Sequence, residues 1–245
     1  MSISVVGGGE NSVQAKSPLI LESKGKRIAI INACEHEFSI ADCGHGGSNP
    51  LDLINMQQDI TNMRGKVDFV VVIIHGGIEY YPYPTPRMKR WYRHFIDLGA
   101  DAVINHHQHC INGYEVYKEK PIFYGLGNFY FPEFIGVKES NTWGSGYAIC
   151  LTLDDSVNFN LIPYYQDVEG ISLRNQKKFK QEMELLNLPI ADDLLLQQKF
   201  DEYVSGLEKK SRHNYYHPLC KGYGCREWHV MDYLVISTKG NMCYY

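Results

Sequence analysis

Two short apolar segments, each with histidine at or just beyond its end, constrain the fold of this chain most strongly. One spans residues 69–74 and precedes His75, and the other spans residues 102–104, just before the segment NHHQH at 105–109. Uninterrupted apolar runs of this length are typical of strands that are buried on both faces of a parallel sheet. Histidines that follow such strands would lie at the carboxyl edge of the sheet, where α/β proteins collect ligands.

Helical patterns separate these strands. Residues 52–64 and 87–98 carry apolar side chains at helical spacing, and Gly99 follows the second pattern at a position where helices often end. A further strand is predicted at residues 27–32. The order strand, helix, strand, helix, strand predicts parallel βαβ units with right-handed crossovers.

The N-terminal part of the chain carries shorter signals. We predict a strand at residues 3–6 that three glycines end, a short helix capped by Asn11, and a hairpin around Lys24-Gly25. Residues 33–50 are rich in Gly, Ser, Asn and Asp and are predicted to form a long loop. Loops of this length in compact domains are often functional.

Beyond the histidines the pattern favours antiparallel strands. These strands are predicted at residues 114–117, 122–124, 147–153 and 159–165, with turns at Lys120-Pro121 and Asp154-Asp155. From about Leu173 the pattern becomes helical, at residues 178–186 and 192–207. The whole chain is therefore expected to be an α/β protein with mixed sheets and a C-terminal helical extension.

The composition excludes several classes of protein. A formal net charge of −4 offers no electrostatic case for binding nucleic acid. No apolar run approaches the roughly 20 residues that a transmembrane helix needs, and the first residues lack the basic and apolar regions of a signal peptide. We therefore expect a cytoplasmic protein. The seven cysteines are scattered and odd in number, which favours reduced thiols.

The spacing of the histidines favours a metal or phosphate site. In an extended segment alternate side chains share one face, so His107 and His109 could converge on one ion, and His75 could approach it from a neighbouring strand. Imidazole and carboxylate ligands together suit Zn, Mn or Fe. The carboxylates that could complete such a site are Glu35, Glu37 and Glu79. The alternative is that all of these are polar loop residues at strand ends.

A family resemblance rests on the same part of the chain. The segments HGGIEYYPYPTP at 75–86 and DLGADAVINHHQHCINGYEVYKEKPIFYGLGNFYF at 97–131 closely resemble the CapA family of bacterial capsule-synthesis and poly-γ-glutamate-synthesis proteins. The resemblance covers about residues 4–165. It implies a metallophosphatase-like (calcineurin-like) fold, which is a four-layer α/β sandwich.

The resemblance also assigns the histidines. In the superfamily pattern His75 matches a lone histidine after a strand, and the cluster at 105–109 matches a Gly-His-x-His motif in which Asn105 replaces the glycine. Either His106 or His107 can lead the ligand pair of that motif. We favour His107 with His109.

The resemblance departs from the superfamily pattern upstream. The first three metal motifs of the superfamily have no counterpart in the expected place, so we expect a partial sandwich that lacks its N-terminal part and an incomplete metal site. Residues 1–170 would form this domain, and residues 171–245 a helical extension with an irregular tail. A lost N-terminal segment that carried a signal or an anchor would instead place the protein in the cell envelope.

The resemblance implies a function in capsule or poly-γ-glutamate biosynthesis, as a metal-dependent hydrolase or phosphoesterase acting on an anionic polymer or a phosphoester. His75, His107 and His109 would hold divalent Mn, Fe or Zn. His106 would act as a general acid, and Glu35 would be a second catalytic residue. The alternative is a non-catalytic domain that binds a polymer or a partner in the same cleft without a working metal pair.

Several other residues are candidates for substrate binding. Glu79, Tyr80 and Tyr81 lie in a proline-rich loop, where they could bind a polar polymer or pack the loop over the site. Asn128 could serve the same site by orienting a ligand histidine, or could simply cap a turn. Arginines at 87, 90 and 93 recur on one helical face, where they meet either an anionic ligand or solvent.

The tail contains a second group of potential zinc ligands. Its members are His213, His217, Cys220, Cys225 and His229. Zinc favours Cys and His ligands, but these spacings fit no standard finger. We therefore expect no zinc site in the tail.

Overall fold

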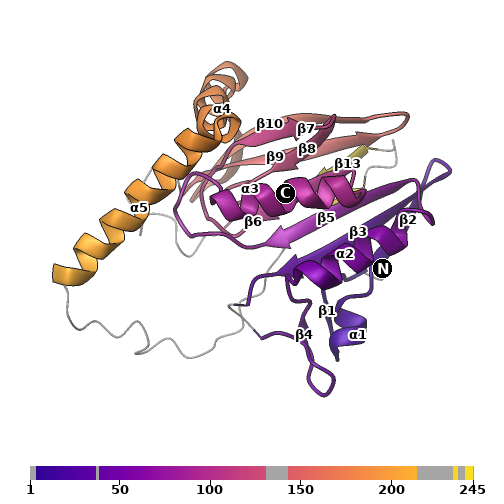
Figure 1. Cartoon of the computed structure of the whole chain (residues 1–245). Helices are drawn as coiled ribbons and strands as arrows, with labels where there is room; N and C mark the ends of the chain where they lie inside the picture. Colours follow the sequence, from indigo (N-terminus) through magenta and orange to yellow (C-terminus); the bar gives the residue numbers. More distant parts are fainter. Residues whose placement is uncertain (1–3, 37–38, 131–142, 214–233, 237–240, 245) are drawn as a thin grey trace.

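A six-stranded mixed sheet forms the centre of the fold in the computed structural model (Figure 1). The structure describes residues 4–36, 39–130, 143–213, 234–236 and 241–244. The strands lie in the order β2 (Leu19–Ser23), β3 (Lys26–Cys34), β5 (Phe69–His75), β6 (Ala102–His106), β8 (Lys120–Phe123) and β7 (Tyr114–Tyr117). The four central strands are parallel, and an antiparallel strand closes each edge.

The register of the parallel strands brings three chain segments to the same edge. Cys34 at the end of β3 pairs with His75 at the end of β5, and His75 pairs in turn with His106 at the end of β6. The apolar residues of β5 are buried throughout, as expected for a strand covered on both faces. The predicted βαβ units are therefore confirmed, with the first histidines of the two runs side by side.

Two helices cover one face of this sheet. They are α2 (Leu53–Met63) and α3 (Pro86–Leu98). Asp52 caps α2 by accepting a hydrogen bond from the Asn55 amide at 2.8 Å. Thr85 caps α3, which ends at Gly99 with a φ of 116°, a conformation that glycine adopts without a steric penalty. Apolar residues of both helices pack against alternate side chains of the parallel strands.

A second, antiparallel sheet packs on the other face. Its strands lie in the order β11 (Gly170–Leu173), β10 (Val157–Asp167), β9 (Ser145–Leu153), β13 (Asn241–Tyr244) and β12 (Leu234–Ile236). Ile30, Val71 and Ile104 of the first sheet share one core with Tyr147 and Ile149 of β9. The described residues thus form three stacked layers, helices, sheet and sheet, which confirms the expected α/β sandwich with mixed sheets.

The C-terminal helices close one side of the sandwich. They are α4 (Gln176–Ala191) and α5 (Asp193–His213), and α4 lies against β7 and β10 (Figure 1). The buried ammonium group of Lys89 in α3 contacts the Ile190 carbonyl and forms an ion pair with Asp193 at 2.5 Å. This ion pair lowers the pKa of the Asp193 carboxyl group.

Some predicted boundaries are confirmed and some are wrong. The hairpin around Lys24-Gly25 and the helix capped by Asn11, α1 (Ser12–Ala15), are present. Residues 4–6 form no strand, and the first pairing is instead between β1 (Gly8–Gly9) and β4 (Gly47–Ser48). Lys120 and Pro121 lie in β8 rather than in a turn. The turn falls at Lys118 and Glu119, which adopt positive φ angles of 48° and 64°.

Elements on both sides of residue 170 share the second sheet, while the division of the chain into two units stays a prediction. In the described part of the chain, no helix has both the length and the apolar character to cross a membrane. Of the tail cluster, His213 is the last residue of α5. The remaining members of that cluster, at 217, 220, 225 and 229, lie outside the described residues.

Candidate functional site

Imidazole rings meet at the carboxyl edge of β5 and β6. The Nδ1 atoms of His75 and His106 lie 3.0 Å apart, and their rings pack edge to face with centroids 4.7 Å apart. A neutral imidazole has one donor and one acceptor nitrogen, so two Nδ1 atoms at this distance need one N–H between them. One ring therefore donates from Nδ1 and the other accepts at Nδ1, so the two histidines orient each other.

His107 and His109 extend the group of histidines beyond the strand. The His107 ring is buried and its centroid lies 4.6 Å from that of His75 and 6.1 Å from that of His109. The expectation that strand alternation would place both side chains on one face is wrong. Both residues adopt positive φ angles, 113° and 55°, so the chain turns after His106 and a turn brings the two rings together. Residues other than glycine rarely adopt this conformation, so surrounding contacts must hold it.

Gln108 provides those contacts. Its side-chain amide donates hydrogen bonds to the carbonyl groups of Gly76 at 3.1 Å and Tyr124 at 2.9 Å. Its backbone carbonyl accepts a hydrogen bond from the Tyr80 amide at 2.7 Å. A Cβ atom on Gly77 would lie 2.5 Å from the Gln108 amide nitrogen, so only glycine fits there. Gln108 therefore joins the turn after His106 to the turn after His75.

The buried side-chain amide of Asn105 forms hydrogen bonds at the same edge of the sheet. Asn105 is fully buried and donates to the carbonyl groups of Gly76 and Tyr124, both at 2.9 Å. It accepts a hydrogen bond from the Tyr92 hydroxyl group at 2.7 Å. Burial raises the pKa of Tyr92 far above its usual value, so the hydroxyl group stays protonated and remains a donor. Asn105 thus connects α3, the residue that follows β8 and the turn after β5.

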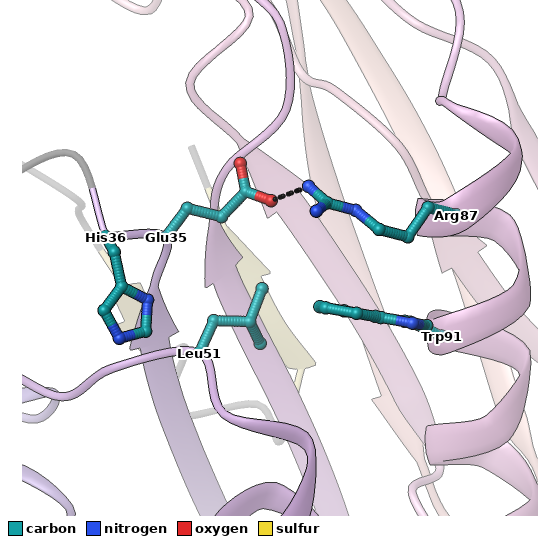
Figure 2. Close-up of a pocket in the computed structure, with 5 residues that line it drawn as sticks. All are labelled: Glu35, His36, Leu51, Arg87 and Trp91. Carbon is teal, nitrogen blue, oxygen red and sulfur yellow. Dashed lines mark hydrogen bonds and ion pairs between the residues drawn. The ribbon is translucent and has the colours of Figure 1, made fainter.

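Glu35 contacts the turn after His75 through the backbone. One carboxylate oxygen accepts a hydrogen bond from the Gly77 amide at 2.9 Å, and the other forms an ion pair with Arg87 at 2.9 Å (Figure 2). A Cβ atom on Gly76 would lie 2.8 Å from the Glu35 side chain, so the carboxylate and the turn are closely packed. Glu35 therefore acts on the position of His75, and its role as a catalytic residue stays a prediction.

His109 packs against two aromatic rings that also contact each other. Its ring stacks on Trp143 with centroids 5.1 Å apart and on Tyr80 with centroids 6.1 Å apart. The Nδ1 atom of His109 lies 2.7 Å from the side-chain oxygen of Asn128, whose amide donates to the Trp143 carbonyl at 3.0 Å. An oxygen acceptor requires the hydrogen on Nδ1, so Nε2 is the nitrogen of the neutral ring that carries the lone pair.

Removing the side-chain amide of Asn128 should allow His109 to adopt both tautomers. In Asn128→Ala, Nδ1 of His109 loses its acceptor, so we expect the histidine ring to populate both tautomers, whereas the unmodified protein holds the Nδ1–H form. Nitrogen-15 NMR of the histidine side chains measures this directly. Asn128→Asp, which keeps an acceptor oxygen, is the matched control. An unchanged tautomer in Asn128→Ala would contradict the assignment.

The remaining candidates lie apart from the rings. Tyr81 is buried against α5, with its ring 4.5 Å from that of Tyr203, and burial raises the pKa of its hydroxyl group to about 12. Glu79 is exposed, and Glu37 lies outside the described residues. The structure therefore brings Tyr80 and Asn128 to the histidines, while Tyr81 packs the proline-rich loop onto α5. Substrate binding by Glu79, Tyr80, Tyr81 and Asn128 stays a prediction.

The three arginines of α3 have different surroundings. Arg93 forms a two-pronged ion pair with Glu115, with nitrogen–oxygen distances of 2.6 and 3.0 Å. Arg90 is exposed to solvent. Arg87 is paired with Glu35 and lies over the Trp91 ring. Arg87 also lines a pocket.

The described side chains do not by themselves form a metal-binding group. Within the described ranges, no three or more His, Cys, Asp or Glu side chains are placed to hold one ion. Cys110 beside the histidines does not add a thiolate, because burial raises its pKa to about 12. The predicted ligands His75, His107 and His109 therefore supply neighbouring imidazoles rather than a complete coordination shell.

Comparison with known sequences places these residues in a family. The model of bacterial capsule synthesis proteins, PGA_cap, matches residues 1–133, a segment that contains all four histidines of the two strand ends. The chain is 33% identical over 134 residues to the capsule biosynthesis protein CapA of Bacillus anthracis, covering 52% of this chain and 33% of that protein. It is 40% identical over 74 residues to the PGA biosynthesis protein CapA of Bacillus subtilis (strain 168), covering 30% and 20%. The aligned part thus spans a third or less of these relatives.

Solved structures give weaker similarities. A hypothetical protein from Thermus thermophilus matches with a TM-score of 0.39 and 14% identity, over 64% of this chain and 62% of that one. A phosphatase from Mycoplasma pneumoniae matches with a TM-score of 0.37 and 12% identity, over 71% of this chain and 63% of that one.

The family match spans more than half of the 245 residues. This chain belongs to the PGA_cap family of bacterial capsule synthesis proteins.

Proposed function

We propose that this chain acts in capsule or poly-γ-glutamate biosynthesis as a hydrolase or phosphoesterase, and that the histidines at the ends of β5 and β6 form its reaction centre. The observation that carries the proposal is the hydrogen-bonded pair His75 and His106, with the His107 ring packed against His75. An anionic polymer or a phosphoester is the substrate class that suits this group, since imidazoles both donate protons and bind oxyanions.

The residues of the centre would have separate tasks. His106 would be the general acid, and His75 would orient its ring through the Nδ1 contact. Because Nε2 of His106 is buried in this structure, a bound substrate would have to reach that atom for the proton to pass to the leaving group. His109 would act as a ligand through Nε2, because Asn128 fixes the hydrogen on Nδ1. Divalent Mn, Fe or Zn is proposed as the cofactor. Because the described residues do not form a complete ligand group, further ligand oxygens would have to come from the substrate or from residues other than those described.

Metal-dependent turnover tests this proposal. The purified protein should hydrolyse a model phosphodiester or poly-γ-glutamate when Mn, Fe or Zn is supplied, and a chelator should abolish the reaction reversibly. The metal content of the purified protein is measured in the same samples. Hydrolysis that persists unchanged after the chelator has removed all metal would contradict metal dependence, and absence of hydrolysis with every metal would contradict the enzyme.

A second candidate is a non-catalytic domain that binds an anionic polymer or a partner in the same place. One observation favours it: among the described side chains, no group of three ligands surrounds a metal position. Binding without turnover discriminates the two. A protein that binds poly-γ-glutamate, contains no metal and hydrolyses nothing would support this second function, and polymer binding that survives in His75→Ala would show that the polymer does not need the reaction centre.

A further inference from the structure

A pocket of about 290 Å³ lies beside the histidines but on the helical side of the sheet (Figure 2). It is lined by Glu35, His36, Leu51, Arg87 and Trp91. Leu51 precedes α2. Arg87 projects from the start of α3 toward Glu35, and Trp91 projects from the same helix toward Leu51 (Figure 2). The pocket thus opens at the carboxyl edge of the sheet, between the starts of two helices. The predicted reaction centre does not use any of its residues except Glu35.

Arg87 supplies the charge of this pocket. Its guanidinium group donates one hydrogen bond to Glu35 at 2.9 Å, and its central carbon lies 5.0 Å from the centroid of the Trp91 ring. A guanidinium group carries five N–H donors, and Glu35 is its one hydrogen-bond acceptor among the described residues. The side chain is 56% exposed, so the other donors are accessible from the pocket. Stacking on Trp91 fixes the plane in which they point.

The surroundings favour an anion at those donors. Arg87 lies in the first turn of α3, which has 13 residues and no acidic residue in that turn. The partial positive charge at the start of the helix therefore adds to the charge of Arg87. Glu35 opposes this charge, but its second oxygen is already bound to the Gly77 amide, which holds the carboxylate against the turn.

The rest of the pocket wall consists of the His36 imidazole and two apolar side chains. Leu51 is buried, and the Trp91 indole forms a flat surface next to the guanidinium group (Figure 2). An anion that also carries methylene groups would contact both, whereas a compact phosphate dianion would leave this surface uncovered and would face the charge of Glu35 more strongly. The pocket therefore suits a carboxylate on a short aliphatic chain.

We propose that this pocket is a subsite for a carboxylate carried on a short aliphatic chain, with the carboxylate on Arg87 and the chain on Trp91 and Leu51. The source of the carboxylate rests on the proposed function: a γ-linked glutamyl unit of the polymer has this chemistry, and so does a free dicarboxylate. Glu35 connects the subsite to the reaction centre, since it touches Arg87 on one side and the turn after His75 on the other.

Titration of tryptophan fluorescence with glutarate tests the subsite in the full chain. Glutarate should change the emission of Trp91 in a saturable way, and Trp91→Phe, which leaves Trp143 and Trp228, should remove that change. Arg87→Gln should weaken glutarate binding about tenfold or more, since it removes a charged hydrogen-bond donor. Arg90→Gln, an exposed arginine on the same helix that does not line the pocket, is the matched control and should bind as the unmodified protein does.

A variant that should bind more tightly tests whether the ligand is an anion. Glu35→Gln removes the opposing carboxylate and should tighten glutarate binding several-fold. Weaker binding in that variant, tighter binding of butylammonium than of glutarate, or tighter binding of inorganic phosphate than of glutarate would each overturn the assignment. Unchanged binding in both Arg87→Gln and Arg87→Lys would also overturn it.

Two further experiments distinguish a failure of the subsite proposal from a failure of the proposed function. Tri-γ-glutamate that binds more tightly than glutarate identifies the polymer as the source of the carboxylate, and equal or weaker binding identifies a free dicarboxylate. Glutarate binding should persist in His75→Ala, because the pocket does not include that ring. If the protein hydrolyses nothing but binds glutarate through Arg87, the enzyme proposal fails and the subsite stands. If the protein hydrolyses polymer but Arg87→Gln does not change glutarate binding, the subsite fails and the enzyme proposal stands.

Discussion

Replacing Asn105 by leucine should lower the free energy of unfolding by about 1–3 kcal/mol, which is the cost of a buried polar group that loses its partner. The side chain is fully buried and makes three hydrogen bonds, to Gly76, Tyr124 and Tyr92. Leucine fills a similar volume but offers neither donor nor acceptor. The Tyr92 hydroxyl group would then be buried without its acceptor, and two carbonyl groups would each lose a donor.

The carbonyl groups of Gly76 and Tyr124 each keep a second hydrogen bond in the variant, which limits the loss of stability. Gln108 also donates to Gly76 and Tyr124, so these two acceptors keep one hydrogen bond each in the variant. The Tyr92 hydroxyl group has no such substitute among the hydrogen bonds of the described residues. Most of the lost stability should therefore come from Tyr92, and Asn105→Leu combined with Tyr92→Phe should be more stable than Asn105→Leu alone.

Urea denaturation measures the difference, and Asn160→Leu is the matched control. Asn160 is exposed in β10, so the same chemical change there should alter stability by less than about 0.5 kcal/mol. A loss at Asn105 no larger than that at Asn160 would show that the buried amide network does not support the sheet edge.

Replacing His75 by alanine should reduce hydrolysis by about 100-fold or more, which is the usual contribution of a positioned acid or base. His75 is the partner in the shared hydrogen bond with His106 and a neighbour of the His107 ring. Without it the His106 ring loses the hydrogen bond that orients it, and the centre loses one imidazole. Because His75 is only half-buried and ends its strand, we expect the fold to tolerate the change.

Much of the fold could be predicted because its signals are local. The strand at 69–74 is a continuous apolar run, and Gly99 marks the end of α3 through its own backbone conformation. The parallel order of β5 and β6 follows from a right-handed crossover through α3, and that order brings His75 and His106 to the same edge. The β1–β4 pairing had no such signal, since it consists of Gly8, Gly9, Gly47 and Ser48, which are residues typical of turns.

The details of the site depend on contacts that are distant in sequence. Trp143 stacks on His109 although many residues separate them along the chain, and Tyr81 turns toward Tyr203 in α5 rather than toward the histidines. No local pattern reports such contacts. Strand alternation failed for His107 and His109 because their positive φ angles break the extended geometry on which it depends.

The ratio of kcat/KM between the unmodified protein and His75→Ala, measured on one phosphodiester with saturating Mn²⁺, tests most directly whether the histidines form a reaction centre. His94→Ala, an exposed histidine of α3, controls for the loss of an imidazole elsewhere. We predict a ratio of about 100 or more for His75→Ala and a ratio near one for His94→Ala. Equal activity of all three proteins, or no activity in the unmodified protein, would contradict the assignment of the reaction centre to His75 and its neighbours.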